Sequence, residues 1–267
     1  MKRRNLAAMS FVAVMIGWAA SARAVDGTIE INQAKILAGT GFPFAISTAN
    51  TSYRLTGSLS VPASTNGINV TVSNVTIDLN GFSITGPCCH GPIGINASGQ
   101  NDATVENGTV TGFGLGVQVG TFGIVRNVHA DKNGFGIQGG NNTVVEGCTA
   151  NNSTFGSVGG AISCSGACAI SANTVNGNPE IGIYCTGNGC VISGNTANNN
   201  ASGIECGGSG CLISGNTADN NLINGLFLSD GTSGYGANVL NGNPTNVSNG
   251  TSMGNNVCGS GISGTVC

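Results

Sequence analysis

Charged side chains are scarce in this chain, and many of them recur at one repeated position. Only 7% of the 267 residues are charged, and only two are His. Between residues 78 and 146, charged or titratable residues recur in steps of 20 to 28 residues, with a cluster in the middle of the run. The members of this group are Asp78, Glu106, Arg126, His129, Asp131, Lys132 and Glu146. They are the first candidates for a functional site.

Acid–base chemistry is one use for these residue types. A lyase or epimerase that acts on a uronate polymer needs a base to remove the proton beside the carboxylate, and a cation to neutralise that carboxylate. We predict His129 as the base and Arg126 or Lys132 as the cation, with Asp131 beside them.

Two other interpretations of the same residues stay open. The carboxylates of Asp78, Glu106 and Glu146 could hold Ca²⁺, which prefers oxygen ligands. Alternatively, an Arg between two Glu residues forms a salt-bridged ladder that only relieves charge repulsion between neighbouring repeats.

An internal repeat positions these residues. Residues 189–204 recur at 210–226, and each repeat holds short runs of alternating apolar and polar residues separated by Gly and Asn. One apolar position recurs at Ile77, Val105, Val125, Val145, Ile170, Ile192 and Ile213, and we expect Leu240 to continue it. No helical stretch lies between the repeats. Stacked repeats of this kind predict an all-β solenoid with parallel strand pairing.

Asn and Gly residues mark the bends of the predicted coil. Asn tolerates a left-handed backbone and can satisfy the hydrogen bonds of its own turn. Asn80, Asn173, Asn195 and Asn216 share one repeat position, which predicts an inward ladder of Asn side chains. Residues 29–38 carry the one short helical pattern, and we expect them to cover the N-terminal end of the solenoid.

The Val-Ile-Ser-Gly-Asn-Thr and Gly-Ile units resemble those of right-handed parallel β-helix proteins, the broad group that contains pectate-lyase-like carbohydrate enzymes. The resemblance predicts an N-terminal cap at 25–50, a single-stranded right-handed β-helix at 51–245 and a disulfide-stapled C-terminal cap at 246–267. It implies a polysaccharide or a cell-surface polymer as partner, although a fold does not fix a function.

A second outward position carries amide, hydroxyl and aromatic side chains, which suit sugar hydroxyls and ring faces. It comprises Asn69, Asn96, Gln118, Gln138, Ser163, Tyr184, Glu205 and Phe227. Of these, we predict Gln118, Gln138, Tyr184, Glu205 and Phe227 as binding residues. A plain solvated sheet would have the same composition. Glycoside hydrolysis needs a pair of carboxylates, and this position offers only Glu205.

The N-terminus predicts export. Residues 1–24 join a basic head, an apolar run and a small-residue end, as in a secretory signal peptide. Removing them leaves four basic residues against 11 acidic ones, a net charge of −7. Such a chain lacks the basic footprint of nucleic-acid binding, and no later segment is apolar enough to span a membrane.

Cysteines of an exported chain are expected to pair. The spacing predicts the bridges Cys164–Cys168, Cys185–Cys190, Cys206–Cys211 and Cys258–Cys267. Cys148 falls at the Asn-ladder position, which predicts a buried thiol. Two alternatives involve metals: the six stacked cysteines could bind copper or zinc as thiolates, and Cys88-Cys89-His90 could form a small metal site.

These observations lead to two functional hypotheses. The first is an exported scaffold without catalysis that binds a polymer and requires no cofactor, with Ca²⁺ as an option. The second is a polysaccharide lyase or epimerase that uses the face of Arg126, His129 and Lys132.

Overall fold

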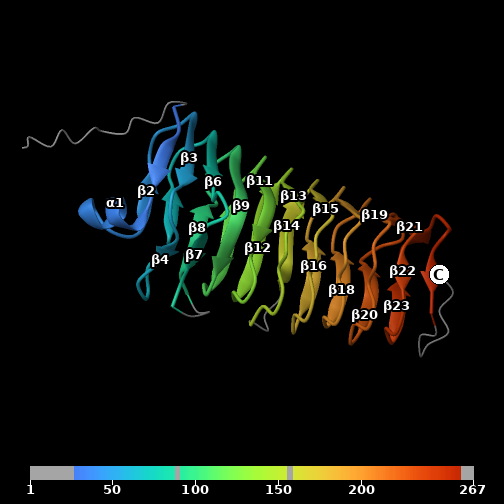
Figure 1. Ribbon diagram of the computed structural model, residues 1–267. Helices are drawn as coiled ribbons and strands as arrows, with labels where there is room; N and C mark the ends of the chain where they lie inside the picture. The colour runs from blue at the N-terminus through green and yellow to red at the C-terminus, as the bar shows by residue number, and fades with distance from the viewer. Residues whose placement is uncertain (1–26, 88–90, 155–158, 260–267) are drawn as a thin grey trace, which may run out of the picture.

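The computed structural model describes residues 27–87, 91–154 and 159–259, which form a parallel β-solenoid of about ten turns. The turns stack along one axis, from the helix α1 (Gln33–Ala38) at the N-terminal end to the last strands at the C-terminal end (Figure 1). The predicted leader, the Cys88-Cys89-His90 segment and Cys267 lie outside the described residues. No helix in the described ranges is long and apolar enough to cross a membrane.

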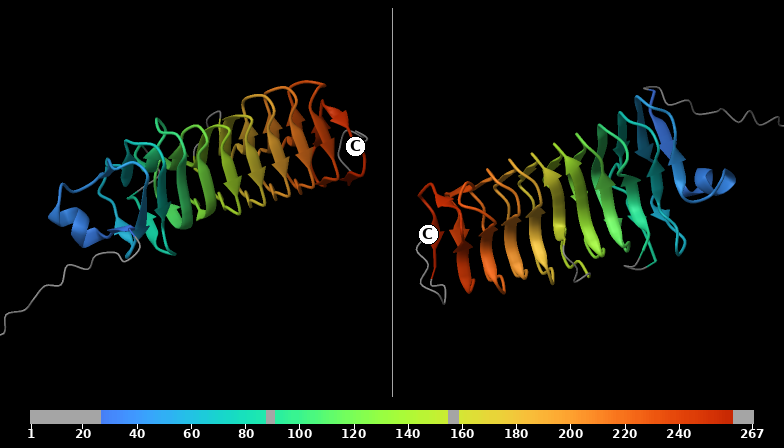
Figure 2. Two further views of the ribbon diagram at one scale, coloured as in Figure 1. Left: turned by 90° about the horizontal axis from the view of Figure 1, so that it is seen from above. Right: turned by 180° about the vertical axis from the view of Figure 1, so that it is seen from behind.

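Two long parallel sheets run the length of the rod, and Figure 2 shows their strands stacked side by side from two directions. Sheet A has 13 strands: β1 (Ile29–Ile31), β3 (Thr51–Leu55), β4 (Leu59–Ser60), β6 (Val75–Asp78), β7 (Ser83–Thr85), β9 (Ala103–Thr111), β11 (Ile124–His129), β13 (Val144–Glu146), β15 (Ala169–Ser171), β17 (Val191–Ser193), β19 (Leu212–Ser214), β21 (Gly234–Gly236) and β24 (Thr251–Ser252). Sheet B has ten: β2 (Phe44–Ile46), β5 (Ile68–Val70), β8 (Ile93–Ala97), β10 (Leu115–Val119), β12 (Phe135–Asn141), β14 (Gly160–Gly166), β16 (Ile181–Cys185), β18 (Ser202–Cys206), β20 (Asn224–Leu228) and β23 (Thr245–Ser248). A small pair is formed by β22 (Val239–Leu240) and β25 (Val257–Cys258).

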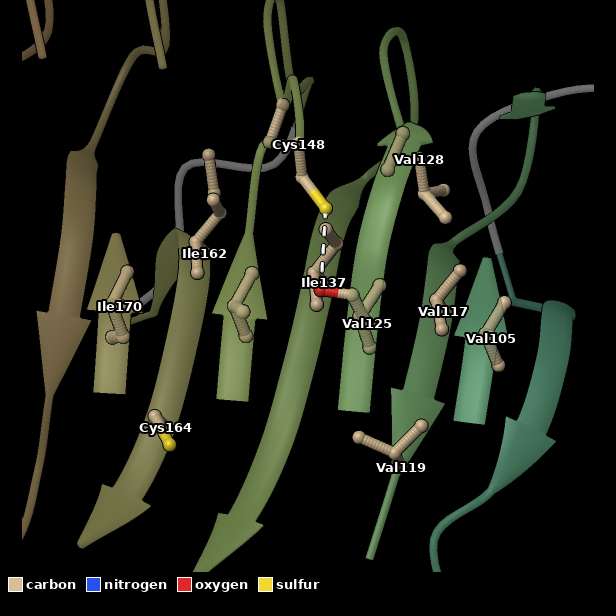
Figure 3. Packing of buried hydrophobic residues seen from close by; sticks show 14 of the residues in the cluster. Val105, Val117, Val119, Val125, Val128, Ile137, Cys148, Ile162, Cys164 and Ile170 are labelled. Atoms are coloured by element: carbon tan, nitrogen blue, oxygen red, sulfur yellow. Dashed lines mark hydrogen bonds between the residues drawn. The ribbon is translucent and has the colours of Figure 1, made fainter. Parts of the chain in front are cut away.

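Apolar side chains from the two sheets meet inside the coil. Figure 3 shows Val105, Val125 and Ile170 of sheet A in the same core as Val117 and Ile137 of sheet B. The predicted apolar column is confirmed from Ile77 to Ile213. These residues form strands because alternate side chains point inward, where neighbouring turns bury them completely.

The expected last member of the apolar column is wrong. Tyr235, not Leu240, pairs with Ile213. Leu240 lies in β22, which pairs with β25 outside the two long sheets. The Asn-Gly bends differ in length from turn to turn, so counting residues from one apolar position overshoots at the last repeat.

The predicted Asn ladder exists, but it begins later than expected. Asn173, Asn195 and Asn216 are buried, and each donates its backbone N–H and its Nδ2 to the side-chain Oδ1 of the Asn in the following turn. These acceptors are Asn195, Asn216 and Asn238. Asn80 is not part of it. That side chain is exposed, with a left-handed backbone at φ 52°, because Leu79 fills the interior of its turn.

Cys148 occupies the head of this ladder, as predicted. Its backbone N–H donates to Asn173 Oδ1 over 2.9 Å. Its free thiol is buried and points toward the backbone carbonyl of Val125 (Figure 3). Burial raises the pKa of the Cys148 thiol to about 11, so it is protonated and a poor nucleophile at neutral pH.

Three of the predicted disulfides are confirmed, in consecutive turns. They join Cys164 to Cys168, Cys185 to Cys190, and Cys206 to Cys211. Each closes the tight bend that follows a strand of sheet B, and their first cysteines stack in register. The bridges occupy the sulfurs that a thiolate metal site would need. Cys258 is also disulfide-bonded, and its predicted partner lies outside the described residues.

The helical prediction for residues 29–38 is half right. Residues Gln33–Ala38 form α1, but Ile29–Ile31 form strand β1, which pairs with β3. Asn32 separates the two elements because its side chain accepts the backbone N–H of Lys35 and so starts the helix. Ile36 is buried against the core.

Candidate functional site

The charged residues of sheet A form one outward column. Strand register aligns six turns in the order Glu30, Arg54, Asp78, Glu106, Arg126 and Glu146. The predicted run from Asp78 to Glu146 is therefore one column, and the structure extends it by two residues that the sequence analysis missed. Because parallel strands lie about 4.8 Å apart, side chains at neighbouring positions are within reach of one another.

Two ion pairs link neighbours in this column. Arg126 Nε donates to Glu106 Oε2 over 2.6 Å, and Arg54 Nε donates to Asp78 Oδ2 over 3.0 Å. Burial alone would raise the pKa of Asp78, but hydrogen bonds from Asn80 and Asn107 and the Arg54 guanidinium lower it overall. Both guanidinium groups thus already hold a carboxylate of the protein.

His129 and Asp131 meet through a third residue. His129 Nδ1 lies 3.0 Å from Thr149 Oγ1, and that hydroxyl donates to Asp131 Oδ2 over 3.0 Å. A hydroxyl that donates to Asp131 accepts from His129, so Nδ1 carries the proton and Nε2 is left as the basic atom. Asp131 Oδ1 also accepts the backbone N–H of Asn151 over 2.7 Å, which fixes the carboxylate.

Arg126 is not part of that relay. It is tied to Glu106, and within the described ranges no hydrogen bond or ion pair joins it to His129. Lys132 is exposed and takes a left-handed backbone at φ 57°. The structure therefore joins His129 to Asp131 through Thr149 and holds Arg126 on Glu106 instead.

The three carboxylates considered for Ca²⁺ are spread along the column. Arg126 lies between Glu106 and Glu146, so these two residues are two turns apart. In the described part of the chain, the one group of three potential metal ligands with mutually close atoms is Cys185, Cys190 and Cys211. Calcium binding by Asp78, Glu106 and Glu146 stays a prediction.

Sheet B carries the second column in unbroken register. The pairing aligns Asn69, Asn96, Gln118, Gln138, Ser163, Tyr184, Glu205 and Phe227. All eight positions were predicted from the repeat. Gln118 Nε2 donates to Gln138 Oε1 over 2.6 Å.

Two open hollows adjoin the Gln side chains on this face. The first is lined by Leu115, Phe135, Gln138, Gly159 and Ser163. The second is lined by Ser98, Gln118, Val119, Gln138, Gly139, Gly140 and Ser165. Gln138 lines both, so its side chain stands between an apolar flank and a flank of small, polar residues.

Farther along the column, Glu205 stands between two aromatic rings. Tyr184 pairs with it from the preceding turn and Phe227 from the following one. Burial raises the pKa of the Glu205 carboxyl, a hydrogen bond from Ser202 opposes this, and the negative charge of Glu180 adds to the rise. This stretch is therefore acidic and aromatic.

Comparison with known proteins agrees with this geometry. The family model described as "right handed beta helix region" matches residues 64–251. The chain belongs to the right-handed β-helix family. A search of curated proteins finds no match to this β-helix protein.

A solved structure shares the fold of this chain. The Dettilon tailspike protein superposes with a TM-score of 0.62 at 18% identity, over 74% of this chain and 46% of the tailspike. The β-helix protein thus spans about half the length of the tailspike. An alginate lyase from Paenibacillus (TM-score 0.43, 13% identity, 87% of this chain, 98% of the lyase) and a mannuronan C-5 epimerase A-module from Azotobacter vinelandii (0.42, 14%, 81% and 83%) are more distant.

Four residues of these sites were not predicted from the sequence. Arg54 and Glu30 match the charged position one and two repeats before Asp78, so extending the repeat backwards would have found both. Thr149 resembles any other Thr of its column, and only the fold places its hydroxyl between His129 and Asp131. Phe135 and Gln138 lie in different outward columns of sheet B, so reading the sequence one column at a time does not bring them together.

Proposed function

We propose that this chain is an exported, non-catalytic β-helix scaffold that binds a polysaccharide along the outer face of sheet B. The observation that carries the proposal is the unbroken outward column of amide, hydroxyl and aromatic side chains, from Asn69 to Phe227, with two hollows beside Gln138.

The chemistry of this column suits a sugar polymer. Amide groups offer a donor and an acceptor together, which matches a sugar hydroxyl that both donates and accepts. The rings of Tyr184 and Phe227 offer flat apolar faces to the C–H faces of pyranose units. A face that repeats at every turn presents one outward side chain per turn at a regular spacing, which suits a repeating polymer.

The other column supports a scaffold over an enzyme. Arg54 and Arg126 each use Nε to hold a carboxylate of the protein, so the positive charge that a substrate carboxylate would need is already partly neutralised. In the described ranges this column therefore fits the salt-bridged ladder considered from the sequence.

Export is part of the proposal. The three disulfides in consecutive turns fit an oxidising compartment, because thiols stay reduced in most cytosols. Residues 1–24 have the pattern of a secretory signal peptide.

A polysaccharide panel tests the proposal. The full chain is run by affinity electrophoresis through gels that contain neutral, acidic or amino-sugar polymers. We expect retardation by at least one polymer and a loss of affinity of about tenfold, or about 1.4 kcal/mol, in Tyr184→Ala or Phe227→Ala. Ser193→Ala, which removes an outward hydroxyl from sheet A, is the matched control and should bind normally. No retardation by any polymer would refute the proposal.

The lyase or epimerase hypothesis is favoured by one observation, the chain from His129 through Thr149 to Asp131. This arrangement orients an imidazole base, as a proton abstraction requires. Absorbance of the unsaturated product would reveal lyase turnover on polyuronates, and proton exchange at the sugar would reveal epimerisation. Turnover lost in His129→Ala and reduced in the isosteric Thr149→Val would replace the scaffold proposal with this one.

A further inference from the structure

We infer that the sheet B face selects an uncharged sugar polymer rather than a polyuronate, with Gln118, Gln138, Phe135 and Ser163 as the centre of the site. This inference rests on the proposed polysaccharide binding and names the class of ligand. It differs from the lyase or epimerase hypothesis, in which an acidic polymer binds at the face of Arg126, His129 and Lys132.

The hydrogen-bonding groups at the centre are matched to hydroxyls. Gln118 Nε2 donates to Gln138 Oε1, and within the described ranges these amides make no other hydrogen bond. The pair therefore presents Gln118 Oε1 as an acceptor beside the N–H groups of Gln138 as donors. A sugar hydroxyl satisfies both, whereas an ionised carboxylate only accepts and would face the Gln118 oxygen with no proton to share.

The shape of the two hollows fits a ring lying across the amide pair. Phe135 and Leu115 form the apolar flank of the first hollow, and the Ser163 hydroxyl lies on the same side of the next turn. The second hollow has Gly139 and Gly140 in its wall, so part of its surface is backbone. An apolar C–H face would then lie on Phe135 while the hydroxyls reach the amides.

Electrostatics disfavours an anionic polymer here. None of the described residues that line the two hollows is ionisable. Along the same column, Glu205 pairs in register with the turn of Tyr184, and Glu180 lies close enough to raise its pKa. A uronate chain that follows the sheet would carry its charges past these carboxylates without meeting a cation in the column.

Calorimetric titration of the full chain tests the ligand class. The probes are soluble neutral polymers (a dextran, a β-glucan and a galactomannan) and two polyuronates (alginate and polygalacturonate). We expect a neutral polymer to bind best, with less than about a twofold change in Kd between about 0.05 and 0.5 M salt, because no charges are neutralised. Gln138→Ala should weaken it about tenfold. Ser193→Ala, on the outer face of sheet A and outside the proposed binding column, should leave Kd unchanged.

The possible results distinguish failure of the uncharged ligand class from failure of polysaccharide binding itself. Tightest binding of a polyuronate, with a Kd that rises with salt and depends on Gln138, would overturn the uncharged ligand class and leave polysaccharide binding intact. Neutral polymer binding that is equal in Gln138→Ala and wild type would overturn the placement of the site. A chain that binds none of the probes, neutral or charged, would overturn the proposed function itself.

Discussion

Removal of one buried amide from the Asn ladder should destabilise the whole rod. The perturbation is Asn195→Ala. Asn195 is 1% exposed, and its Oδ1 accepts both the backbone N–H and the Nδ2 of Asn173, each over 2.9 Å. Its Nδ2 donates to the backbone oxygen of Ile170, also over 2.9 Å. No solvent reaches these groups.

The expected loss of stability follows from the buried groups that lose their hydrogen-bond partners. Alanine leaves the Asn173 N–H without an acceptor and takes a donor from the Ile170 carbonyl. A buried group left unsatisfied costs about 1–3 kcal/mol, so the two together predict a loss of about 2–6 kcal/mol in the free energy of unfolding. With a urea m-value of about 3 kcal/mol/M for a chain of this size, the unfolding midpoint should fall by about 1–2 M.

Urea unfolding followed by far-UV circular dichroism measures the effect. The matched control is Asn198→Ala, which removes the same side chain from the same turn at a partly exposed position. Asn198 Oδ1 accepts the backbone N–H of Asp219 over 2.8 Å, and water can replace it there. The control should lose less than about 1 kcal/mol. Equal midpoints for the two variants would show that burial of the ladder is not what stabilises the coil.

Three further predictions concern the cysteines and the half-buried carboxyl of Glu205. The double variant Cys206→Ala/Cys211→Ala should lose about 2 kcal/mol, measured by the same unfolding assay, because a short closed loop restricts the unfolded chain only modestly. Cys148 should resist alkylation in the native protein at pH 8 and react after denaturation, as peptide mapping would show; rapid native labelling would contradict its burial and raised pKa. Glu205→Gln should stabilise the protein at pH 7 but not at pH 4. The folded-state pKa of Glu205 lies above the unfolded one, so folding favours the protonated acid, and its ionisation costs stability as pH rises through the two values. If Glu205→Gln is less stable than the wild type at pH 7, the folded-state pKa of Glu205 is not raised.

Local pattern was enough to predict the repeating part of the fold. The alternation around Ile77, Val125 and Ile192 places the same side chains inward in every turn, and stacking then fixes the register of the outward columns. The eight positions of the sheet B column followed from counting alone. The three tight bends closed by disulfides were equally local, since the two cysteines of each bridge are four or five positions apart in the sequence.

Prediction failed where neighbouring turns differ. Asn80 shares its repeat position with Asn195, yet Leu79 occupies the interior of that turn and Asn80 is exposed. Leu240 follows an irregular bend, so Tyr235 takes the expected place. Residues 29–31 have a helical pattern, but the open edge of β3 pairs with them as a strand. The first two failures come from the make-up of the turn itself, and the third comes from a contact with another turn.

The sequence by itself determined the periodic properties of this protein: parallel coils, inward apolar and Asn columns, outward polar columns, and paired cysteines. These depend on short-range alternation and on bends that each repeat encodes anew. Only the tertiary structure decided which carboxylate each Arg holds, how Thr149 joins His129 to Asp131, and that Phe135 and Gln138 border one hollow. Those contacts join side chains from different turns or different outward columns, and their geometry depends on how each coil is laid on the next.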